Sequence, residues 1–286
     1  MIGADRLSPK PSAAMGVLAA LLEARTGQQI AANRTWRIET ALKPVLRTLG
    51  LDTLDALVLA LAQDEAGGPI AGMVVDALLN QETSFYRDSG VLEAVASVVE
   101  GLADKGVTRR ARVWSAACST GQEPLSLAIL FAERAARFGA AEPEIVASDV
   151  SGAAIARAKA GRYSQFEIQR GLPVRRMIDW FEAVGNEWVA RPELVRRVQY
   201  RRHNLVSDPL PPGRFDVVLC RNVLLYLSPA LRRQVLDRLA GALRPDGLLV
   251  LGAGETVIGN GDAFTPSARL KGFYGLSPTF DASAAA

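Results

Sequence analysis

Apolar side chains recur every three or four residues through the first part of the chain, a spacing typical of amphipathic helices. The spacing is clearest in two runs, Val17, Leu18, Leu21 and Leu22 and later Leu54, Leu57, Val58 and Leu61. Turn signals at Thr26-Gly27 and Leu49-Gly50 divide the helices. The Gly67-Gly68-Pro69 run then breaks the pattern. The sequence therefore predicts an all-α N-terminal domain over residues 1–70.

From residue 71 the pattern changes to short apolar strands that alternate with helical stretches. The predicted strands are Ala111–Ala117, Glu144–Val150, Val198–Leu205, Asp216–Cys220 and Gly247–Gly252. Helical spacing over Pro124–Phe138 separates the first two strands, and helical spacing over Pro229–Leu243 separates the last two. This order predicts the α/β class over residues 71–280, with a doubly wound, mainly parallel sheet covered by helices on both faces.

A mixed, charged stretch over residues 163–199 interrupts this order before the third predicted strand. It contains Trp180, Phe181 and Trp188, and we expect it to form a small subdomain inserted into the larger domain. The alanine-rich end of the chain, residues 281–286, is predicted to be disordered.

Composition narrows the class of protein. The 286 residues carry 33 Lys and Arg against 30 Asp and Glu, and a net charge of +3 is too small to indicate a nucleic-acid partner. Cys118 and Cys220 each end an apolar strand, which suits buried thiols in a reducing compartment better than a disulfide. No apolar run reaches the roughly 20 residues that cross a bilayer, and the start lacks the order of a signal peptide. These features predict a soluble cytoplasmic protein with no membrane insertion and no metal site.

The end of the first predicted strand is the best candidate for a ligand site, because open parallel sheets bind ligands at the carboxyl ends of their strands. Its loop holds one glycine, Gly121, where a dinucleotide-binding loop has three. S-adenosylmethionine has no phosphate, but it has an ammonium that Glu123 could bind and ribose hydroxyls that Asp149 could bind. The alternative is that Glu123 favours a helix N-terminus and that Asp149 caps the following helix.

Five runs together resemble the CheR-type chemotaxis methyltransferases in their order and spacing. They are Gln81–Asp88 (QETSFYRD), Trp114–Pro124 (WSAACSTGQEP), Ala147–Asp149 (ASD), Asn204-Leu205 and Phe215–Val223 (FDVVLCRNV). The resemblance covers the chain from the N-terminal helices to Phe273. It implies an S-adenosylmethionine-dependent protein-glutamate O-methyltransferase, with a Rossmann-like class I methyltransferase sheet and a small inserted β-subdomain.

The resemblance also implies which residues form the site. Contacts with the cofactor are expected from Gln81, Thr83, Arg87, Gly121, Glu123, Asp149, Asn204, Leu205, Arg221 and Asn222. Arg87 and Tyr226 are expected nearest to the transferred methyl group and are the candidate catalytic residues. Without the resemblance, Arg87 is equally a surface arginine, and Tyr226 an aromatic that covers the sheet. The chain departs from the family at Gln81, Tyr86 and Gln122, where Asn, Phe and Glu respectively are frequent.

A glutamate acceptor makes a general base unnecessary. Its carboxylate has a reference pKa of about 4.3, so it is ionised at neutral pH and is already a nucleophile. The single histidine, His203, lies in the third predicted strand and is assigned a structural or surface role. Arg87 can orient a carboxylate by a bidentate contact, and Tyr226 can donate its hydroxyl.

Basic residues gather between residues 25 and 47. One acid, Glu39, lies among five basic residues: Arg25, Arg34, Arg37, Lys43 and Arg47. Acidic helical partners would be attracted there, although such a cluster is often a solvated helix face. Pro44 is expected to kink or restart the helix, so that Arg34 and Arg37 share a face more readily than all five do. The resemblance implies that the cytoplasmic helical bundle of a chemoreceptor is recognised here, through Arg34, Arg37, Lys43 and Arg47.

The inserted stretch resembles the family's β-subdomain, which in some members binds a peptide at the receptor C-terminus. Its turn Val184–Trp188 (VGNEW) is shorter than the loop of those members, so a receptor tail is not expected to be required.

Two other functions stay open, a methyltransferase on a small molecule or nucleic acid and a signalling module that binds the cofactor or a nucleotide without methyl transfer. Against DNA amino-methylation, Arg221–Leu224 lacks the Asn/Asp-Pro-Pro-aromatic run that such enzymes carry.

Overall fold

A computed structural model describes residues 12–31, 34–64, 68–104, 109–138 and 141–280. The tail expected at 281–286 lies outside these residues. The chain divides into two compact units. One holds the chain up to Asn80 together with Tyr226–Ser228, and the other holds Gln81–Leu225 and the chain from Pro229 onward. The division after Asn80 differs from the boundary expected near residue 70.

The smaller unit consists of helices that enclose an apolar core. Its helices are α1 (Ala13–Thr26), α2 (Trp36–Leu49), α3 (Leu54–Gln63) and α4 (Pro69–Leu78). The fully buried side chains are Leu18, Leu22, Ile38, Leu42, Leu57 and Val74. Gly68 is the N-cap of α4 and Pro69 opens its first turn, which suits a residue without an N–H group. The glycine-proline run is therefore the start of a fourth helix of this unit.

Two glycines end helices as the turn signals predict. Gly27 after α1 and Gly50 after α2 have φ of 75° and 66°, a left-handed conformation that glycine adopts without strain. The helix does not restart at Pro44, because α2 continues through it. Pro44 lies on the exposed side of α2, while Ile38 and Val45 on either side of it in sequence are buried in the core and hold the helix in place.

The larger unit is built on a seven-stranded sheet in the order β6-β2-β1-β7-β8-β10-β9. The strands are β1 (Arg112–Ala116), β2 (Glu144–Asp149), β6 (Val198–Arg202), β7 (Phe215–Cys220), β8 (Leu243–Leu251), β9 (Phe264–Pro266) and β10 (Phe273–Leu276). The first five are parallel neighbours, and β10 and β9 run antiparallel at one edge. Ser115 of β1 pairs with Ala147 of β2 on one side and Leu219 of β7 on the other. The strand order therefore reverses between β1 and β7.

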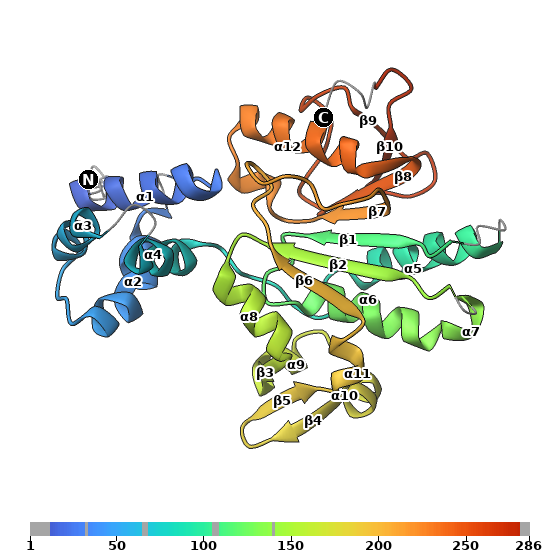
Figure 1. The fold of residues 1–286 in the computed structure, drawn as a ribbon, viewed down its shortest axis with the longest axis horizontal. Coiled ribbons are helices and arrows are strands. Elements are labelled where there is room, and N and C mark those ends of the chain that lie inside the picture. Colours follow the sequence, from blue (N-terminus) through green and yellow to red (C-terminus); the bar gives the residue numbers. More distant parts are fainter. Residues whose placement is uncertain (1–11, 32–33, 65–67, 105–108, 139–140, 281–286) are drawn as a thin grey trace, which may run out of the picture. The chain divides into compact units, whose positions relative to one another are not determined.

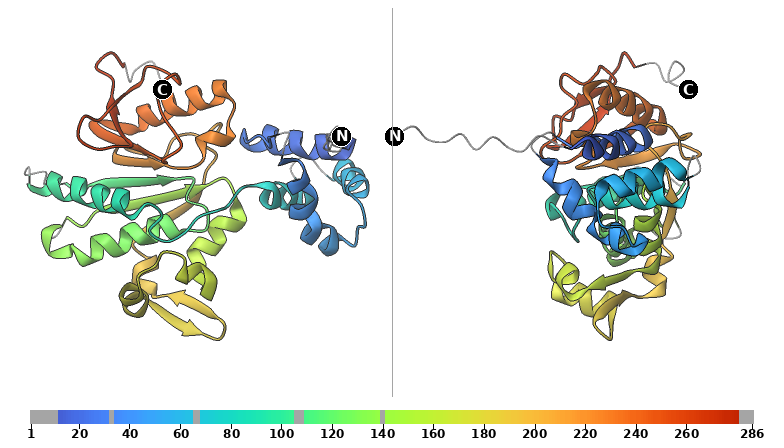
Figure 2. Two further views of the ribbon diagram at one scale, coloured as in Figure 1. Left: turned by 180° about the vertical axis from the view of Figure 1, so that it is seen from behind. Right: turned by 90° about the vertical axis from the view of Figure 1, so that its left-hand side faces the viewer.

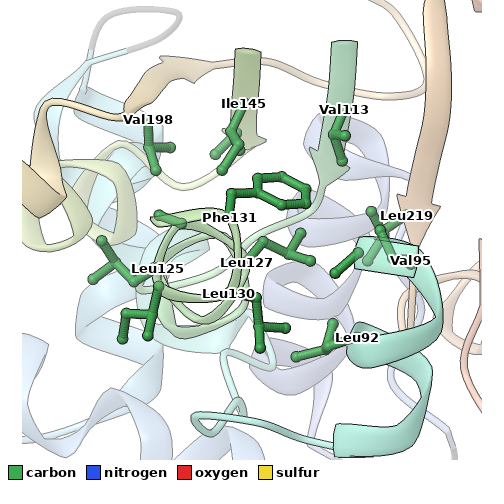
Figure 3. Close-up of a cluster of buried hydrophobic side chains, with 14 of the residues drawn as sticks. Leu92, Val95, Val113, Leu125, Leu127, Leu130, Phe131, Ile145, Val198 and Leu219 are labelled. Carbon is green, nitrogen blue, oxygen red and sulfur yellow. The ribbon is translucent and has the colours of Figure 1, made fainter. Parts of the chain in front are cut away.

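Helices cover this sheet. They are α5 (Ser89–Asp104), α6 (Gln122–Glu133), α7 (Ala135–Phe138), α8 (Gly152–Ala160) and α12 (Pro229–Ala242). Figure 2 shows α5 and α6 on one face of the sheet. In Figure 3, apolar side chains of these two helices, including Val95 and Phe131, face Val113, Ile145 and Leu219 of the strands. The strand residues next to these in sequence, such as Trp114 after Val113, point to the opposite face of the sheet and are buried there.

A small antiparallel sheet, in the order β3-β5-β4, is inserted between α8 and β6 (Figure 1). The inserted subdomain consists of β3 (Arg162–Ser164), α9 (Gln165–Gln169), α10 (Val174–Trp180), β4 (Phe181–Val184), β5 (Glu187–Ala190) and α11 (Pro192–Val195). A two-residue turn, Gly185-Asn186, joins β4 to β5, and Gly185 has φ of 62°. The structure thus confirms the predicted α/β fold, with a doubly wound, mainly parallel sheet, an inserted β-subdomain and preceding helices. No helix in the described part of the chain combines the length and apolar character needed to span a bilayer.

Candidate functional site

Backbone strain gathers at the carboxyl ends of β1 and β7, where the strand order reverses. Among the described residues, five non-glycine residues have positive φ: Tyr86, Asp88, Ala117, Ser119 and Asn222. Two of them follow β1 and one follows β7, while the other two lie in the predicted Gln81–Asp88 motif. Such conformations are unfavourable for most side chains and persist where the surroundings enforce them, often at functional sites. This edge is therefore the candidate site.

The loop after β1 is closely packed. Gly121 has φ of 94° and begins α6. A Cβ atom at this position would lie 2.8 Å from Cβ of Ala158 in α8. Tyr163 donates its hydroxyl to Thr120 O at 2.9 Å. The single glycine thus allows the start of α6 to pass close to α8, and the loop has none of the glycine spacing that serves a pyrophosphate.

Asp149 ends β2 with a fixed carboxylate. Its Oδ2 accepts from Ser119 N at 2.8 Å, and its Oδ1 accepts from Ser151 N at 2.9 Å. Ser119 also donates its hydroxyl to Gln81 O, and Gln81 Nε2 donates to Ser151 Oγ. The structure therefore brings the candidates Gln81 and Asp149 together. Ser151, and not Asp149, is the N-cap of α8, because its Oγ accepts from Ala154 N.

Glu123 and Arg221 form a buried ion pair. Glu123 Oε2 accepts from Arg221 Nη1 at 2.9 Å, and its Oε1 accepts from Ser115 Oγ at 2.7 Å. The Arg221 side chain is 2% exposed, and its Nη2 donates to the carboxylate of Asp88 and to Arg87 O. One guanidinium thus joins the first turn of α6 to the Gln81–Asp88 segment. The paired acids stabilise this buried charge, and removing them would leave an unpaired buried cation and destabilise the protein.

The loop after β6 holds two further candidates, Asn204 and Leu205. Asn204 Oδ1 accepts from Val206 N at 3.0 Å, and Asn204 N donates to Asp208 at 2.9 Å. Arg238 of α12 donates its Nε to Leu205 O at 3.0 Å. The loop is therefore fixed by its own polar side chains and by α12. Sequence reasoning missed Arg238, which is one of several arginines on a helix with no motif around it.

Glu255 fixes the loop after β7, and sequence reasoning missed it as well. Its carboxylate accepts four backbone N–H groups, those of Asn222, Val223, Leu224 and Gly252, at 2.6–2.9 Å. Asn222 itself has φ of 60°. An acid directly after a Gly-Ala-Gly turn at the end of a predicted strand was the available signal, since Asp149 also stands at a strand end.

The two candidate catalytic residues lie in different units. Arg87, in the larger unit, is half-buried and donates to Glu82 O at 3.3 Å, a long hydrogen bond. Tyr226 belongs to the helical unit, where its hydroxyl accepts from Asn80 and its carbonyl oxygen accepts from Gln29 N. Thr83 is half-buried in the same segment as Arg87.

His203 and the two cysteines have structural surroundings. Burial lowers the pKa of His203, whose Nε2 lies 3.1 Å from Pro209 O and whose ring packs edge-on against Trp114. The imidazole is therefore neutral and part of the core, in agreement with the structural role predicted for it. Cys118 and Cys220 are buried free thiols, and burial raises the pKa of each. Such thiols behave as small apolar side chains.

Four basic residues of the helical unit lie on α2 or directly before it. Arg34 precedes α2, and Lys43 and Arg47 lie one turn apart on its exposed side. Trp36, with 64% of its surface exposed, lies on the same side at helical spacing. Because α2 continues through Pro44, Lys43 and Arg47 share one face of the helix, and the expectation that Arg34 and Arg37 share a face stays a prediction.

The polar groups at the sheet edge fit a ligand of mixed charge. Asp149 is an acceptor-only group suited to hydroxyls, Glu123 can accept from an ammonium, and Arg87 can bind a carboxylate. A pyrophosphate would instead require glycines and N–H groups at the start of α6, where Gly121 is committed to packing. The residues therefore fit S-adenosylmethionine.

Comparisons with known proteins agree with this chemistry. Residues 81–272 match the family described as CheR methyltransferase, SAM binding domain. The chain is 37% identical over 241 residues to chemotaxis protein methyltransferase 1 of Pseudomonas aeruginosa, which covers 82% of this chain and 87% of the relative. It is 34% identical over 251 residues to chemotaxis protein methyltransferase Cher2 of Pseudomonas putida, with 85% of this chain and 90% of the relative covered. A chemotaxis protein methyltransferase of Vibrio parahaemolyticus is 32% identical over 251 residues, and the match covers 85% of this chain and 89% of the relative.

Proposed function

Because this chain belongs to the CheR methyltransferase family and carries its S-adenosylmethionine-binding domain, we propose that it methylates glutamate side chains of a chemoreceptor. The products would be glutamate methyl esters, the marks of sensory adaptation. The observations that support a carboxylate acceptor are an arginine near the site and a histidine that is neutral. Arg87 lies beside Arg221 at the sheet edge and its side chain makes a long hydrogen bond to Glu82 O, whereas the single histidine is buried with a lowered pKa. Such a site suits a nucleophile that is already an anion.

We propose that the cofactor lies along the carboxyl edge of β2, β1 and β7. Asp149, oriented by two N–H groups, would accept from the ribose hydroxyls, and Glu123 from the ammonium. The other contacts are proposed for Gln81, Thr83, Arg87, Gly121, Asn204, Leu205, Arg221 and Asn222. Glu255 and Arg238 would act through the loops that carry these residues.

The bound cofactor supplies a methyl group on a positively charged sulfur. Arg87 would hold the incoming carboxylate by two parallel hydrogen bonds. A catalytic role for the Tyr226 hydroxyl stays a prediction from the family resemblance. Holding the oxygen in line with the methyl carbon supplies most of the acceleration, because the reactants need no further activation. Exclusion of water would assist, since charge is lost as the anion approaches the cation.

We propose that the exposed side of α2 recognises the receptor. Lys43 and Arg47 form a basic pair there, and Arg34 and Arg37 extend it toward the start of the helix. An acidic helical bundle of a chemoreceptor in the cytoplasm is a complementary partner. The two-residue turn between β4 and β5 offers little surface for a peptide, so a receptor tail would not be required.

Reversing the charge of this pair is expected to weaken receptor recognition alone. In Lys43→Glu/Arg47→Glu, KM for the receptor fragment should rise about tenfold at low salt, less at high salt, because long-range attraction is screened. The control is Lys159→Glu/Lys271→Glu, which makes the same charge change at two exposed lysines of the larger unit. Initial rates over a range of receptor concentrations measure the effect. Equal KM in the two variants would argue against α2 as the docking surface.

The acceptor can be identified by the stability of the product. Purified protein is incubated with S-adenosylmethionine labelled in its methyl group and with receptor cytoplasmic fragments. A glutamate ester releases the label as methanol in mild base, whereas methylated amines and amides retain it. Label retained after base treatment would rule out the proposed carboxyl methylation, and fragments with Glu→Gln changes at candidate positions provide the control.

A further inference from the structure

The inserted subdomain packs against the segment that carries Arg87. The ring of Phe85 packs edge-on against Tyr163 of β3 and Phe181 of β4, with centroids 5.0 and 5.5 Å away. Gly171, between α9 and α10, has φ of 99°, and a Cβ atom there would lie 2.1 Å from Phe85 O. Aromatic packing and close backbone contact thus join the subdomain to residue 85, two positions before the candidate catalytic arginine.

Arg176 of α10 makes the next contact, with Tyr86. Its guanidinium carbon lies 4.6 Å from the centroid of the Tyr86 ring, within the range of a cation–π interaction. Glu133 of α6 accepts from Arg176 at 2.7 Å, and Glu93 of α5 lies 3.6 Å away. The hydrogen bond to Glu133 raises the pKa of Arg176, and burial raises the pKa of Tyr86, so a fixed cation lies over a neutral phenol ring.

Arg87 therefore lies between two residues in strained conformations, each held by an arginine. Tyr86 has φ of 50° and is held by Arg176, with Tyr86 N donating to Ser126 Oγ. Asp88 has φ of 55° and is paired with Arg221, which also donates to Arg87 O. A left-handed tyrosine is uncommon and persists where contacts enforce it. Each of the two residues that flank Arg87 thus contacts a different arginine.

We propose that Arg176 is a positioning residue for Arg87, so that the inserted subdomain is part of the catalytic apparatus of this chain. The inference rests on the proposed function, because it takes Arg87 as the group that orients the acceptor carboxylate. Loss of Arg176 frees Tyr86 to relax from its strained conformation and turns Arg87 away from the acceptor. The subdomain performs this task through its own side chains, without a bound peptide.

The test compares two neighbouring arginines of α10. Arg176→Ala removes the contact with Tyr86, while Arg175→Ala removes an arginine that is 94% exposed in its side chain and 3.9 Å from Asp179. Rates of base-labile ester formation are measured at saturating receptor fragment and cofactor, with cofactor affinity and the midpoint of thermal unfolding measured in parallel. Arg176→Ala should lower kcat about 10- to 100-fold, the order of effect expected for a small displacement of a reacting group, with cofactor affinity unchanged. Arg175→Ala should match the unmodified protein.

Arg176→Lys serves as the conservative variant. A lysine retains a cation over the ring and one ion pair, so it should recover a substantial part of the lost rate. Equal kcat for the Arg176→Ala and Arg175→Ala variants would overturn the inference and leave the proposed function intact. A parallel fall in kcat, cofactor affinity and unfolding midpoint, with no recovery by lysine, would show a general structural role and also overturn it. An unmodified protein that forms no base-labile ester would overturn the proposed function and this inference together.

Discussion

Replacing Arg87 by alanine should lower kcat about 10²- to 10³-fold while cofactor affinity changes only a few fold. The expected loss corresponds to about 3–4 kcal/mol, the order of two charge-assisted hydrogen bonds to the acceptor carboxylate in the transition state. Within the described residues, the Arg87 side chain makes a long hydrogen bond to Glu82 O at 3.3 Å, so it can turn to a substrate at small cost. The free energy of unfolding should change little, because the side chain is half-buried and its hydrogen bond to Glu82 O is long.

The measurement is kcat for ester formation at saturating substrates, together with calorimetric titration by S-adenosylhomocysteine. Arg87→Lys should recover part of the rate but not all, because an ammonium lacks the planar two-pronged geometry. Arg110→Ala, at an exposed arginine that donates no side-chain hydrogen bond to an acid among the described contacts, is the matched control. Cofactor affinity falling in step with kcat would make cofactor binding the main role of Arg87 and contradict the proposed division of roles.

Replacing Asp149 by alanine should have the opposite signature, with cofactor affinity about 100-fold weaker and kcat at saturating cofactor close to normal. Two hydrogen bonds from ribose hydroxyls to an ionised acceptor contribute about 1.5–3 kcal/mol each, and their imperfect additivity brings the loss to about 3 kcal/mol. The substitution also leaves the N–H groups of Ser119 and Ser151 without this acceptor. The unfolding midpoint should therefore fall by a few degrees.

Calorimetry with S-adenosylhomocysteine measures the affinity, and Asp149→Asn separates charge from shape. The amide retains one oxygen but presents a donor to one of the two N–H groups, so we expect an affinity between those of the alanine variant and the unmodified protein. Asp246→Ala, at an exposed acid, is the control. Unchanged affinity in Asp149→Ala would remove Asp149 from the cofactor site.

The fold was predictable where local chemistry decides it. Apolar alternation located all five parallel strands, and Gly27 and Gly50 marked helix ends because only a residue without a side chain adopts positive φ there at no cost. No restart of the helix occurs at Pro44, because tertiary packing of Ile38 and Val45 outweighs the local preference. The Gly-Pro run near residue 68 was ambiguous, since the same residues begin helices and join domains.

The site was predictable at strand ends and unpredictable where partners are distant in sequence. Asp149 could be proposed from the sequence because it stands at the end of a predicted strand, where ligands of parallel sheets bind. Arg176 lies 90 positions from Tyr86 and Glu255 lies 33 from Asn222, and no periodicity connects such pairs. The Glu123–Arg221 pair spans 98 positions, so that Glu123 was predicted to contact the ligand without its protein partner being foreseen. Family resemblance supplied Arg87 and Tyr226, which the residue pattern alone left undecided.

The Glu255 carboxylate joins two separate turns, because it accepts four backbone N–H groups from them. Ala253 and Gly254 at the tip of the second turn are exposed. We therefore expect the tip of the second turn to tolerate changes in sequence or length, provided that an acid remains at the position of Glu255. Sequence changes at Ala253 and Gly254 should therefore leave the site at the turn after β7 unchanged.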